Sequence, residues 1–242
     1  KALNEKEEYE RYGISIPNGM LLYGPPGCGK TFIAEKFAEE IAFNFISVKP
    51  SDLASIYVHG SQEKIGKLFE DAKQNAPSII FFDEIDALLP NRQGDINHSY
   101  ASEVNEFLAQ MTECGRFDIF IIAATNRPEK IDTAVLRTGR LDKKIFVGPP
   151  DLKAREELFH IYLEKRPTDF SIDFSILANK TEFFVASDIK FIIDEASREA
   201  LLSKSRINQK LMEKVIENFK PSISKDILTN YEVLRAKMES KE

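Results

Sequence analysis

The sequence predicts an α/β protein in which a five-stranded parallel sheet flanked by helices is followed by a small all-helical domain. Two observations lead to this prediction. Up to about residue 150, short apolar runs alternate with segments whose apolar residues recur at helical spacing, which is typical of parallel strands joined by helices. Beyond Gly148-Pro149-Pro150 only the helical spacing continues. We therefore expect a large domain over residues 1–150 and a small helical domain over residues 151–242.

Four short apolar runs and one segment of alternating apolar and polar residues, 43–48, are the candidate strands, and the helical stripes lie between and after them. The strands are expected at 20–23, 43–48, 79–82, 119–124 and 144–147. Between them, residues 33–41, 65–72 and 104–111 carry apolar side chains every three or four positions, as one buried helix face requires. After residue 150, further helices are expected around Leu158, Ile189, Ile207 and Ile227. The polar stretch 90–99 is expected to be a loop.

Composition and charge limit the class of protein. The 242 residues carry a net charge of -6, and this argues against a binder of duplex nucleic acid, because such proteins usually present a basic face. No apolar run approaches the roughly 20 residues of a membrane span, and no signal peptide opens the chain. Cys28 and Cys114 have the spacing of neither a disulfide framework nor a metal site, which favours a cytoplasmic setting. Because Lys1 is not Met, we expect a piece of a longer protein.

A glycine-rich motif follows the first apolar run. Residues 24–31 are Gly-Pro-Pro-Gly-Cys-Gly-Lys-Thr, which fits the pattern G-x-x-x-x-G-K-[ST]. Glycines let backbone N–H groups approach phosphate oxygens, and the next helix offers its unsatisfied N–H groups. Lys30 adds a charge for the β- and γ-phosphates, and the Thr31 hydroxyl is a ligand for Mg²⁺. The predicted ligand is ATP with Mg²⁺, bound by Gly24, Pro25, Pro26, Gly27, Cys28, Gly29, Lys30, Thr31 and Phe32.

Plainer interpretations of this motif are also open. A chance glycine-rich turn would give the same pattern, although the position between a strand and a helix is the context that phosphate binding requires. Cys28 is either a reactive thiol or a small residue that fills space, and we favour the second interpretation.

Two carboxylates end the third predicted strand. Asp83 and Glu84 directly follow the apolar run 79–82. We expect Asp83 to position Mg²⁺ opposite Thr31, and Glu84 to take the proton from the attacking water. Adjacent carboxylates repel each other unless a cation lies nearby, so the pair fits a site for Mg-ATP. The alternative is an exposed acidic loop that caps the next helix.

Four segments, taken in order, resemble the signatures of AAA ATPases. Residues 24–31 resemble Walker A, 83–86 Walker B, 123–128 sensor 1 and 136–142 the second region of homology. The similarity covers nearly the whole chain and is to the branch of valosin-containing protein, the proteasomal ATPases and the membrane AAA proteases. It implies a P-loop NTPase fold with a helical lid. It also implies ATP hydrolysis in a homo-hexameric ring that remodels, unfolds or disassembles protein substrates.

The resemblance assigns roles that spacing alone does not. Asn126 corresponds to sensor 1, which helps to hold the attacking water near the γ-phosphate. Arg137 and Arg140 correspond to the arginine fingers, which stabilise transition-state charge in the neighbouring subunit's ATP site. Tyr57 and Val58 correspond to the pore loop that grips a polypeptide; for Tyr57 the alternative is ordinary packing.

The sequence departs from the family pattern at three places. The residues after the pore-loop pair are His59-Gly60, where the family usually has Gly-Glu. Segment 181–188 lacks both glycines of the lid motif Thr-x-Gly-Phe-Ser-Gly-Ala-Asp, which predicts an altered approach of its backbone to the nucleotide. Tyr162 stands where many relatives have a His near the adenosine, and it either stacks there or packs in the core.

Three other functions are weighed against the motor. A nucleic-acid motor is disfavoured by the acidic balance, so no nucleic-acid partner is expected. A zinc protease requires H-E-x-x-H, and the three histidines are not so arranged. A nucleotide-gated scaffold with little turnover is disfavoured by the intact Lys30, Glu84 and Asn126.

Overall fold

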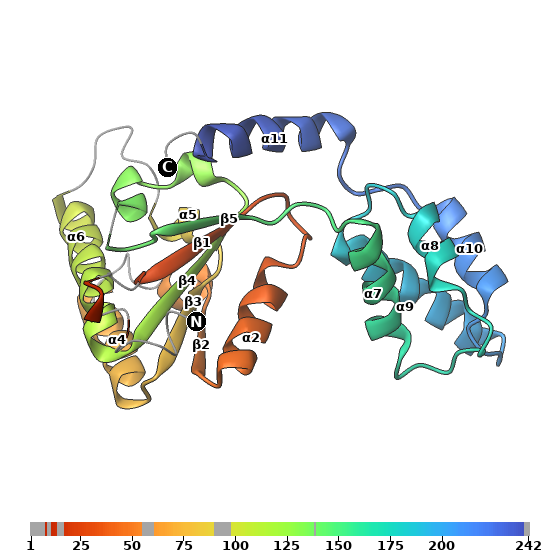
Figure 1. Cartoon of the computed structure of the whole chain (residues 1–242), viewed down its shortest axis with the longest axis horizontal. Helices are drawn as coiled ribbons and strands as arrows, with labels where there is room; N and C mark the ends of the chain where they lie inside the picture. Colours follow the sequence, from red (N-terminus) through yellow and green to blue (C-terminus); the bar gives the residue numbers. More distant parts are fainter. Residues whose placement is uncertain are drawn as a thin grey trace. The chain divides into compact units, whose positions relative to one another are not determined.

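The computed structural model describes residues 8, 11–13, 17–54, 61–89, 98–137 and 139–239. The chain divides into an α/β unit, Lys1–Gly24 with Lys30–Phe146, and a helical unit, Val147–Glu242 with Pro25–Gly29 (Figure 1). The predicted fold class, a five-stranded parallel sheet flanked by helices and followed by a helical lid, is confirmed. The domain bounds expected from the sequence stay a prediction.

The sheet holds its five strands in the order β2-β3-β4-β1-β5, and every neighbouring pair is parallel. The strands are β1 Gly19–Tyr23, β2 Asn44–Val48, β3 Ser78–Phe82, β4 Ile119–Thr125 and β5 Lys143–Phe146. Every residue of β3 and β4 is buried, as expected of parallel strands that helices cover on both faces. The two outer strands, β2 and β5, carry exposed residues.

Helices cover both faces of the sheet. Figure 1 shows α2 (Lys30–Ile41) on one face, and α4 (Ser61–Gln74) and α6 (His98–Glu113) on the other. The chain crosses the sheet from β1 to β2 and then returns through β3 and β4. Right-handed crossovers in opposite directions place their helices on opposite faces. Because α6 begins at His98, the end of the predicted loop 90–99 is helical; residues 90–97 lie outside the described part.

Short elements that the sequence did not predict follow the strands and α6. They are the helices α3 (Pro50–Ala54) and α5 (Ile85–Leu88) and the 3₁₀ turns Cys114–Phe117, Pro128–Lys130 and Thr133–Leu136. Each is one turn or little more, so its sequence is too short to show helical periodicity.

The register of the strands brings the predicted motifs to one edge of the sheet. Tyr23 pairs with Thr125, and Phe82 pairs with Ala123. Because parallel strands end at the same edge, the segments that follow β1, β3 and β4 lie beside one another. The strand order also reverses direction at β1, and ligands bind open α/β sheets at such switch points.

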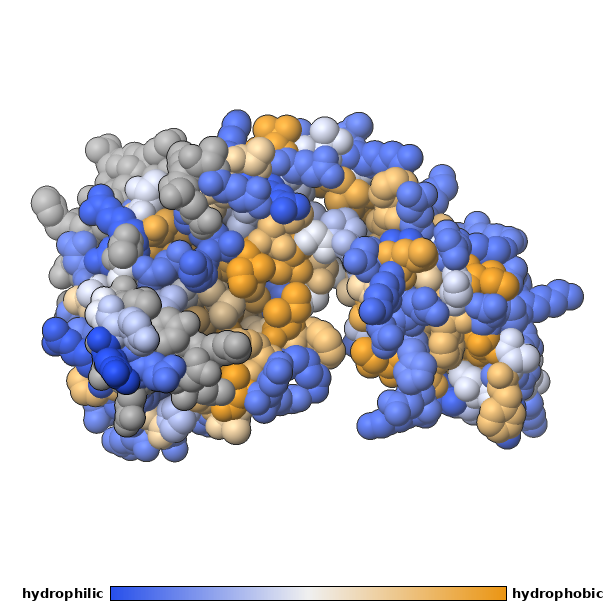
Figure 2. Space-filling model, in the orientation of Figure 1, coloured by the Kyte–Doolittle hydropathy of each residue, from blue (hydrophilic) through white to orange (hydrophobic). Residues whose placement is uncertain are grey.

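The helical unit contains five helices among its described residues. They are α7 Leu152–Leu163, α8 Phe174–Lys180, α9 Ala186–Leu202, α10 Gln209–Asn218 and α11 Lys225–Glu239. The sequence predicted four of them and missed α8, which has only seven residues. The inward faces of α7, α8, α9 and α10 form one apolar core around Phe159, Ile192 and Met212, to which α11 adds no buried residue. Hydrophilic side chains cover most of the visible face of this unit (Figure 2).

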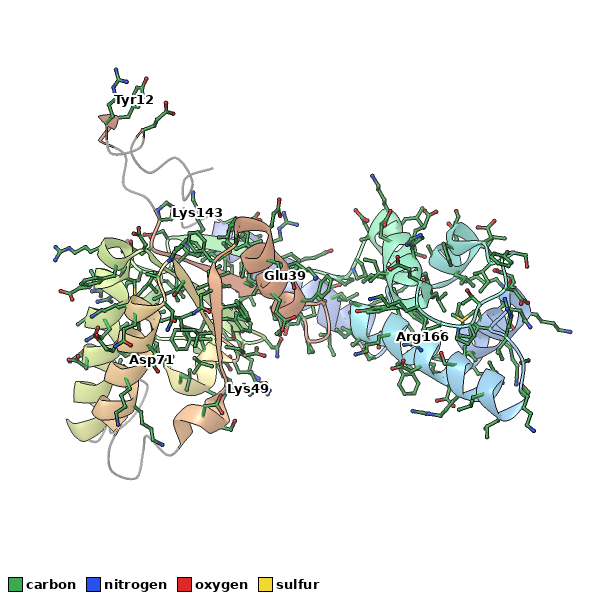
Figure 3. The ribbon with its side chains drawn as sticks, turned by 90° about the horizontal axis from the view of Figure 1, so that it is seen from below. Tyr12, Glu39, Lys49, Asp71, Lys143 and Arg166 are labelled. Atoms are coloured by element: carbon green, nitrogen blue, oxygen red, sulfur yellow. The ribbon has the colours of Figure 1, made fainter. Side chains whose placement is uncertain are left out.

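Buried and half-buried polar side chains connect the helices of this unit. Arg155 is 7% exposed; its Nε donates to the Ala178 carbonyl at 3.0 Å, and its Nη1 to the Pro150 carbonyl at 2.9 Å. Burial lowers the pKa of this guanidinium. Arg166, labelled in Figure 3, pairs with Asp194 at 2.6 Å. These contacts fix the chain that enters α7 and join α9 to the chain after α7.

Tyr162 packs against the apolar core of the helical unit, which supports its interpretation as a core residue. Its side chain is partly buried. Burial raises the pKa of Tyr162, and the nearby Asp194 raises it further.

Candidate functional site

The glycine-rich loop begins directly after β1 and ends where α2 starts. Gly27 and Gly29 have φ angles of 76° and 91°, a left-handed backbone that residues with a side chain rarely adopt. Alternation of such residues with right-handed ones turns successive N–H groups to one side and forms an anion-binding concavity. Lys30 is only 8% exposed, and its Nζ donates to the Gly24 carbonyl at 2.9 Å. Thr31 and Phe32 belong to the first turn of α2, whose N–H groups lack helical partners.

The middle of this loop packs within the helical unit. The Gly27 carbonyl accepts a hydrogen bond from the Ser187 N–H at 3.0 Å, at the start of α9. A Cβ on Gly27 would lie 2.2 Å from Ser187 Oγ, so a larger residue does not fit without a shift. Cys28 is 8% exposed, which agrees with its interpretation as a small residue in a confined space.

The lid motif departs from the family pattern in a way that the structure explains. Phe183 stands at the first missing glycine and keeps the left-handed backbone of a glycine, with φ 68°. Lys225 lies over its ring, with Nζ 4.6 Å from the centroid. Asp188, which is 4% exposed, accepts hydrogen bonds from the backbone N–H groups of Val185 and Ser222, both at 3.2 Å. The backbone near the glycine-rich loop is therefore held without the two glycines.

Asp83 and Thr31, which the sequence predicts to hold a metal ion, lie close together. Asp83 follows β3, and its Oδ2 lies 3.4 Å from Thr31 Oγ1. Its other oxygen accepts a hydrogen bond from the Glu84 N–H at 3.0 Å. A carboxylate and a hydroxyl are hard oxygen ligands, and Mg²⁺ takes few of these from protein beside phosphate and water. The pair therefore fits Mg²⁺ that arrives with a nucleotide.

Glu84 is exposed beside this pair. Its φ and ψ are 49° and 50°, a left-handed conformation that costs a residue with a Cβ about 1 kcal/mol. The residue precedes the short helix α5. Strained residues of this kind cluster at functional sites, and this backbone leaves the carboxylate in contact with solvent.

A buried threonine whose role the sequence did not reveal connects α5 to the segment after β4. Thr125 is 1% exposed; its hydroxyl donates to Asp86 Oδ1 at 2.6 Å and accepts from the Arg127 N–H at 2.8 Å. Asn126, the predicted sensor, is half-buried between Thr125 and Arg127. Asp86 and Thr125 belong to the Walker B and sensor 1 segments, so the sequence marked both residues. Their spacing did not predict the hydrogen bond between them.

The two predicted finger residues differ in their surroundings. The Arg137 side chain is exposed. Arg140 is half-buried, and its Nη1 donates to the Ala134 carbonyl at 2.6 Å while its Nε donates to Thr112 Oγ1 at 3.3 Å. Burial lowers the pKa of Arg140, and the charge of Arg137 lowers it further. The sequence pattern treats the two arginines alike, whereas the structure engages Arg140 within its own unit.

The predicted pore-loop residues Tyr57 and Val58 lie outside the described residues. Among the residues that are described, no three His, Cys, Asp or Glu side chains gather as a metal site. The helices found in that part of the chain are all too short or too polar to cross a membrane.

Comparison with known proteins matches residues 20–149 to the family described as "ATPase family associated with various cellular activities (AAA)". The chain is 40% identical to the ATPase family gene 2 protein of Saccharomyces cerevisiae, over 95% of its own length and 30% of that protein. It is 38% identical to the Cell division cycle protein 48 homolog of Archaeoglobus fulgidus, over 96% of the chain and 34% of the relative. It is also 38% identical to the ATP-dependent zinc metalloprotease FtsH of Staphylococcus haemolyticus, over 81% of the chain and 27% of the relative. The chain thus spans about a third of the length of these relatives.

Proposed function

The chain belongs to the AAA family of ATPases, and we propose that it is the motor module of a ring that uses ATP hydrolysis to remodel protein substrates. One observation carries the proposal: the Thr31–Asp83 oxygen pair lies beside the exposed Glu84, at the sheet edge where the glycine-rich loop begins. A metal-binding pair next to a carboxylate in contact with solvent is what hydrolysis of a nucleotide phosphate requires.

In this proposal the loop 24–29 and the start of α2 bind the phosphates through backbone N–H groups. Lys30 exchanges its hydrogen bond to the Gly24 carbonyl for a phosphate oxygen. Thr31 and Asp83 hold Mg²⁺, which when bound supplies positive charge that offsets the charge of the phosphates.

Glu84 takes a proton from water while the water oxygen attacks the γ-phosphorus and the bond to ADP breaks. Asn126 orients that water. The hydrogen bond from Thr125 to Asp86 keeps the Asn126 segment at a constant position relative to α5, which directly follows Glu84. Proximity of a correctly held base and water supplies much of the rate.

The finger residues act in the neighbouring subunit of the ring. The exposed Arg137 reaches the neighbour's ATP, and Arg140 contributes from a position that its bonds to Ala134 and Thr112 define. The family match supports this role of the two arginines. The chemistry of the side chain agrees with it, because the guanidinium is a permanently charged phosphate ligand. The proposed role of Tyr57 and Val58, which is to grip a polypeptide, rests only on the resemblance of their segment to the pore loop of the family. The cytoplasmic setting and the lack of a nucleic-acid partner stay predictions.

The Glu84→Gln variant tests the proposal, with Glu70→Gln on the exposed face of α4 as the matched control. We expect Glu84→Gln to bind ATP about as tightly as the natural chain. Its turnover should be lower by about 100-fold or more, since a general base contributes 10²–10⁴ in rate. Light scattering with ATP-Mg²⁺ should then show a shift from monomer to ring, expected to contain six subunits. Glu70→Gln should match the natural chain in every respect.

Two outcomes contradict parts of this proposal. Loss of ATP binding in Glu84→Gln would show that Glu84 supports the nucleotide rather than the water. A monomer with and without nucleotide, in this chain and in the full-length protein, would contradict the ring and the action of the arginines in trans.

A further inference from the structure

Asn18 links three segments of the α/β unit just before β1. Its Nδ2 donates to the Gly139 carbonyl at 2.8 Å and to the Thr112 carbonyl at 3.3 Å. Its backbone N–H donates to Asp142 Oδ2 at 3.0 Å, and its carbonyl accepts from the Ile121 N–H at 3.0 Å. One residue therefore joins the end of α6, the strand β4 and the segment 139–142.

Asp142 completes the link from the other side. While one carboxylate oxygen accepts from the Asn18 N–H, the other accepts from the Gly139 N–H. Gly139 is thus held at both its N–H and its carbonyl, and its φ of 88° is left-handed. Leu141 anchors the same segment in the core, with 0% exposure. The backbone beside Arg140 is fixed by side-chain hydrogen bonds from a residue more than a hundred positions away.

Two glycines, Gly19 and Gly115, leave the space that Asn18 and its hydrogen-bond partners occupy. A Cβ on Gly115 would lie 2.2 Å from Asn18 Oδ1. A Cβ on Gly19 would lie 2.6 Å from the Ile121 carbonyl and 3.0 Å from the Arg140 carbonyl. A side chain at either position would displace Asn18 or the strand neighbour of β1, so Asn18 sits in a close-packed place.

Thr112 connects the link to the arginine itself. Its carbonyl accepts from Asn18 Nδ2, and its hydroxyl accepts from Arg140 Nε. Arg137 precedes Gly139 by two residues. Arg140 therefore sits next to backbone that Asn18 and Asp142 hold, and Arg137 lies two positions before that backbone in the sequence.

We infer that Asn18 is a positioning residue for the arginines of segment 137–140, which act on ATP in a neighbouring subunit. This inference rests on the proposed function. Asn18 touches neither nucleotide nor water in it; it acts through Gly139, Thr112 and Asp142. Its loss should therefore impair the ATP site of the neighbour and spare the site of its own subunit.

Asn18→Ala removes both side-chain donors and leaves the backbone bond to Asp142. Asn75→Ala is the matched control, because Asn75 Nδ2 makes a single 2.8 Å bond to the Asp71 carbonyl on the surface of α4. We expect Asn18→Ala to lower ATP turnover about tenfold, since an orphaned carbonyl costs about this factor or more. ATP affinity should stay within about twofold, as the residue is remote from the phosphate loop in this proposal. Asn75→Ala should change neither quantity.

Mixed assemblies separate a defect in the neighbour's site from a defect in the subunit's own site. Asn18→Ala subunits are mixed with an excess of Glu84→Gln subunits, which have natural arginines but an inactive site. We expect turnover per Asn18→Ala subunit to recover to at least half of the natural value, because a Glu84→Gln neighbour completes its site. Arg137→Ala mixed with Glu84→Gln is the reference pair and should recover in the same way.

The reference pair distinguishes the two ways of failing. If Arg137→Ala recovers and Asn18→Ala does not, Asn18 serves its own site and the inference is overturned. If neither recovers, the arginines do not act in trans, and the proposed function falls with the inference. Hydrogen exchange of the unassembled chain gives a second measure: protection at Gly139–Asp142 should drop in Asn18→Ala only. Unchanged protection there would also overturn the inference.

Discussion

The two units hold the residues around the glycine-rich loop by different means. In the α/β unit, side chains bond to side chains: Thr31 to Asp83, and Thr125 to Asp86. In the helical unit the contact with the loop is from backbone to backbone, Ser187 N–H to Gly27 carbonyl. The Walker A, Walker B and sensor 1 segments keep the family pattern, while segment 181–188 departs from it. A backbone hydrogen bond involves no side-chain atom, so the side-chain departures of segment 181–188 leave this contact in place.

Among the substitutions that test this contrast, Thr125→Val should have the largest effect, because it breaks a side-chain contact of the α/β unit. Valine has nearly the same shape but neither donates to Asp86 nor accepts from Arg127. Loss of a hydrogen bond to a charged group costs about 2 kcal/mol, which corresponds to about 30-fold in turnover. We expect this drop in kcat at nearly constant ATP affinity, measured by steady-state hydrolysis and by equilibrium binding.

Thr125→Ser is the conservative control for this substitution, because it keeps the hydroxyl. It should retain turnover within about threefold. Equal turnover of the Val and Ser variants would show that the hydroxyl does not position the site. The contrast between the units would then rest on sequence pattern alone.

Arg155→Met should affect the stability of the helical unit rather than the chemistry. The substitution leaves the Ala178 and Pro150 carbonyls without the donors that Arg155 provides. The Ala178 carbonyl keeps its hydrogen bonds from Thr181, so the cost is the loss of the bonds from a charged donor, which lowers the free energy of unfolding by about 2 kcal/mol. Denaturant unfolding followed by circular dichroism measures this loss, with turnover per folded molecule expected to change little.

Arg198→Met is the matched control on the same unit. Arg198 forms an exposed pair with Glu195 one turn away on α9, at 2.7 Å. Such surface pairs contribute about 0.5 kcal/mol or less. If both arginine variants unfold at the same denaturant concentration, the bonds of Arg155 to the backbone do not stabilise the unit.

The sequence predicted those features that depend on local periodicity. All five strands lie within a residue or two of the expected segments. For the fully buried β3 and β4 the reason is that buried parallel strands are short and continuously apolar. The missed elements, α8 among them, are too short to show a period. The motifs after β1, β3 and β4 were expected to share one site, and the strand register brings these segments to one edge.

The roles of the positioning residues could not be predicted from the sequence. Asn18 and Gly139 are joined by a bond across 121 positions, and no periodic pattern connects them. The same holds for Thr125 and Asp86, which belong to recognised motifs but gain a joint role only when β3 and β4 pair. Arg137 and Arg140 look equivalent in the sequence, and only the bonds to Ala134 and Thr112 distinguish them.

Lys225→Met should give the smallest effect, and it tests how the helical unit keeps a left-handed residue without glycine. Lys225 Nζ lies 4.6 Å from the Phe183 ring, and a cation over an exposed aromatic face contributes about 0.5–1 kcal/mol. We expect a loss of this size in the free energy of unfolding, and no loss when Phe183→Gly is already present. Lys73→Met offers the comparison in the α/β unit, because Lys73 lies 4.5 Å over Phe117, whose φ is not positive. A greater loss at Lys225 than at Lys73 would show that the cation offsets backbone strain. Equal losses would mean that Phe183 is held by its neighbours in the core and that Lys225 adds only the ordinary contact.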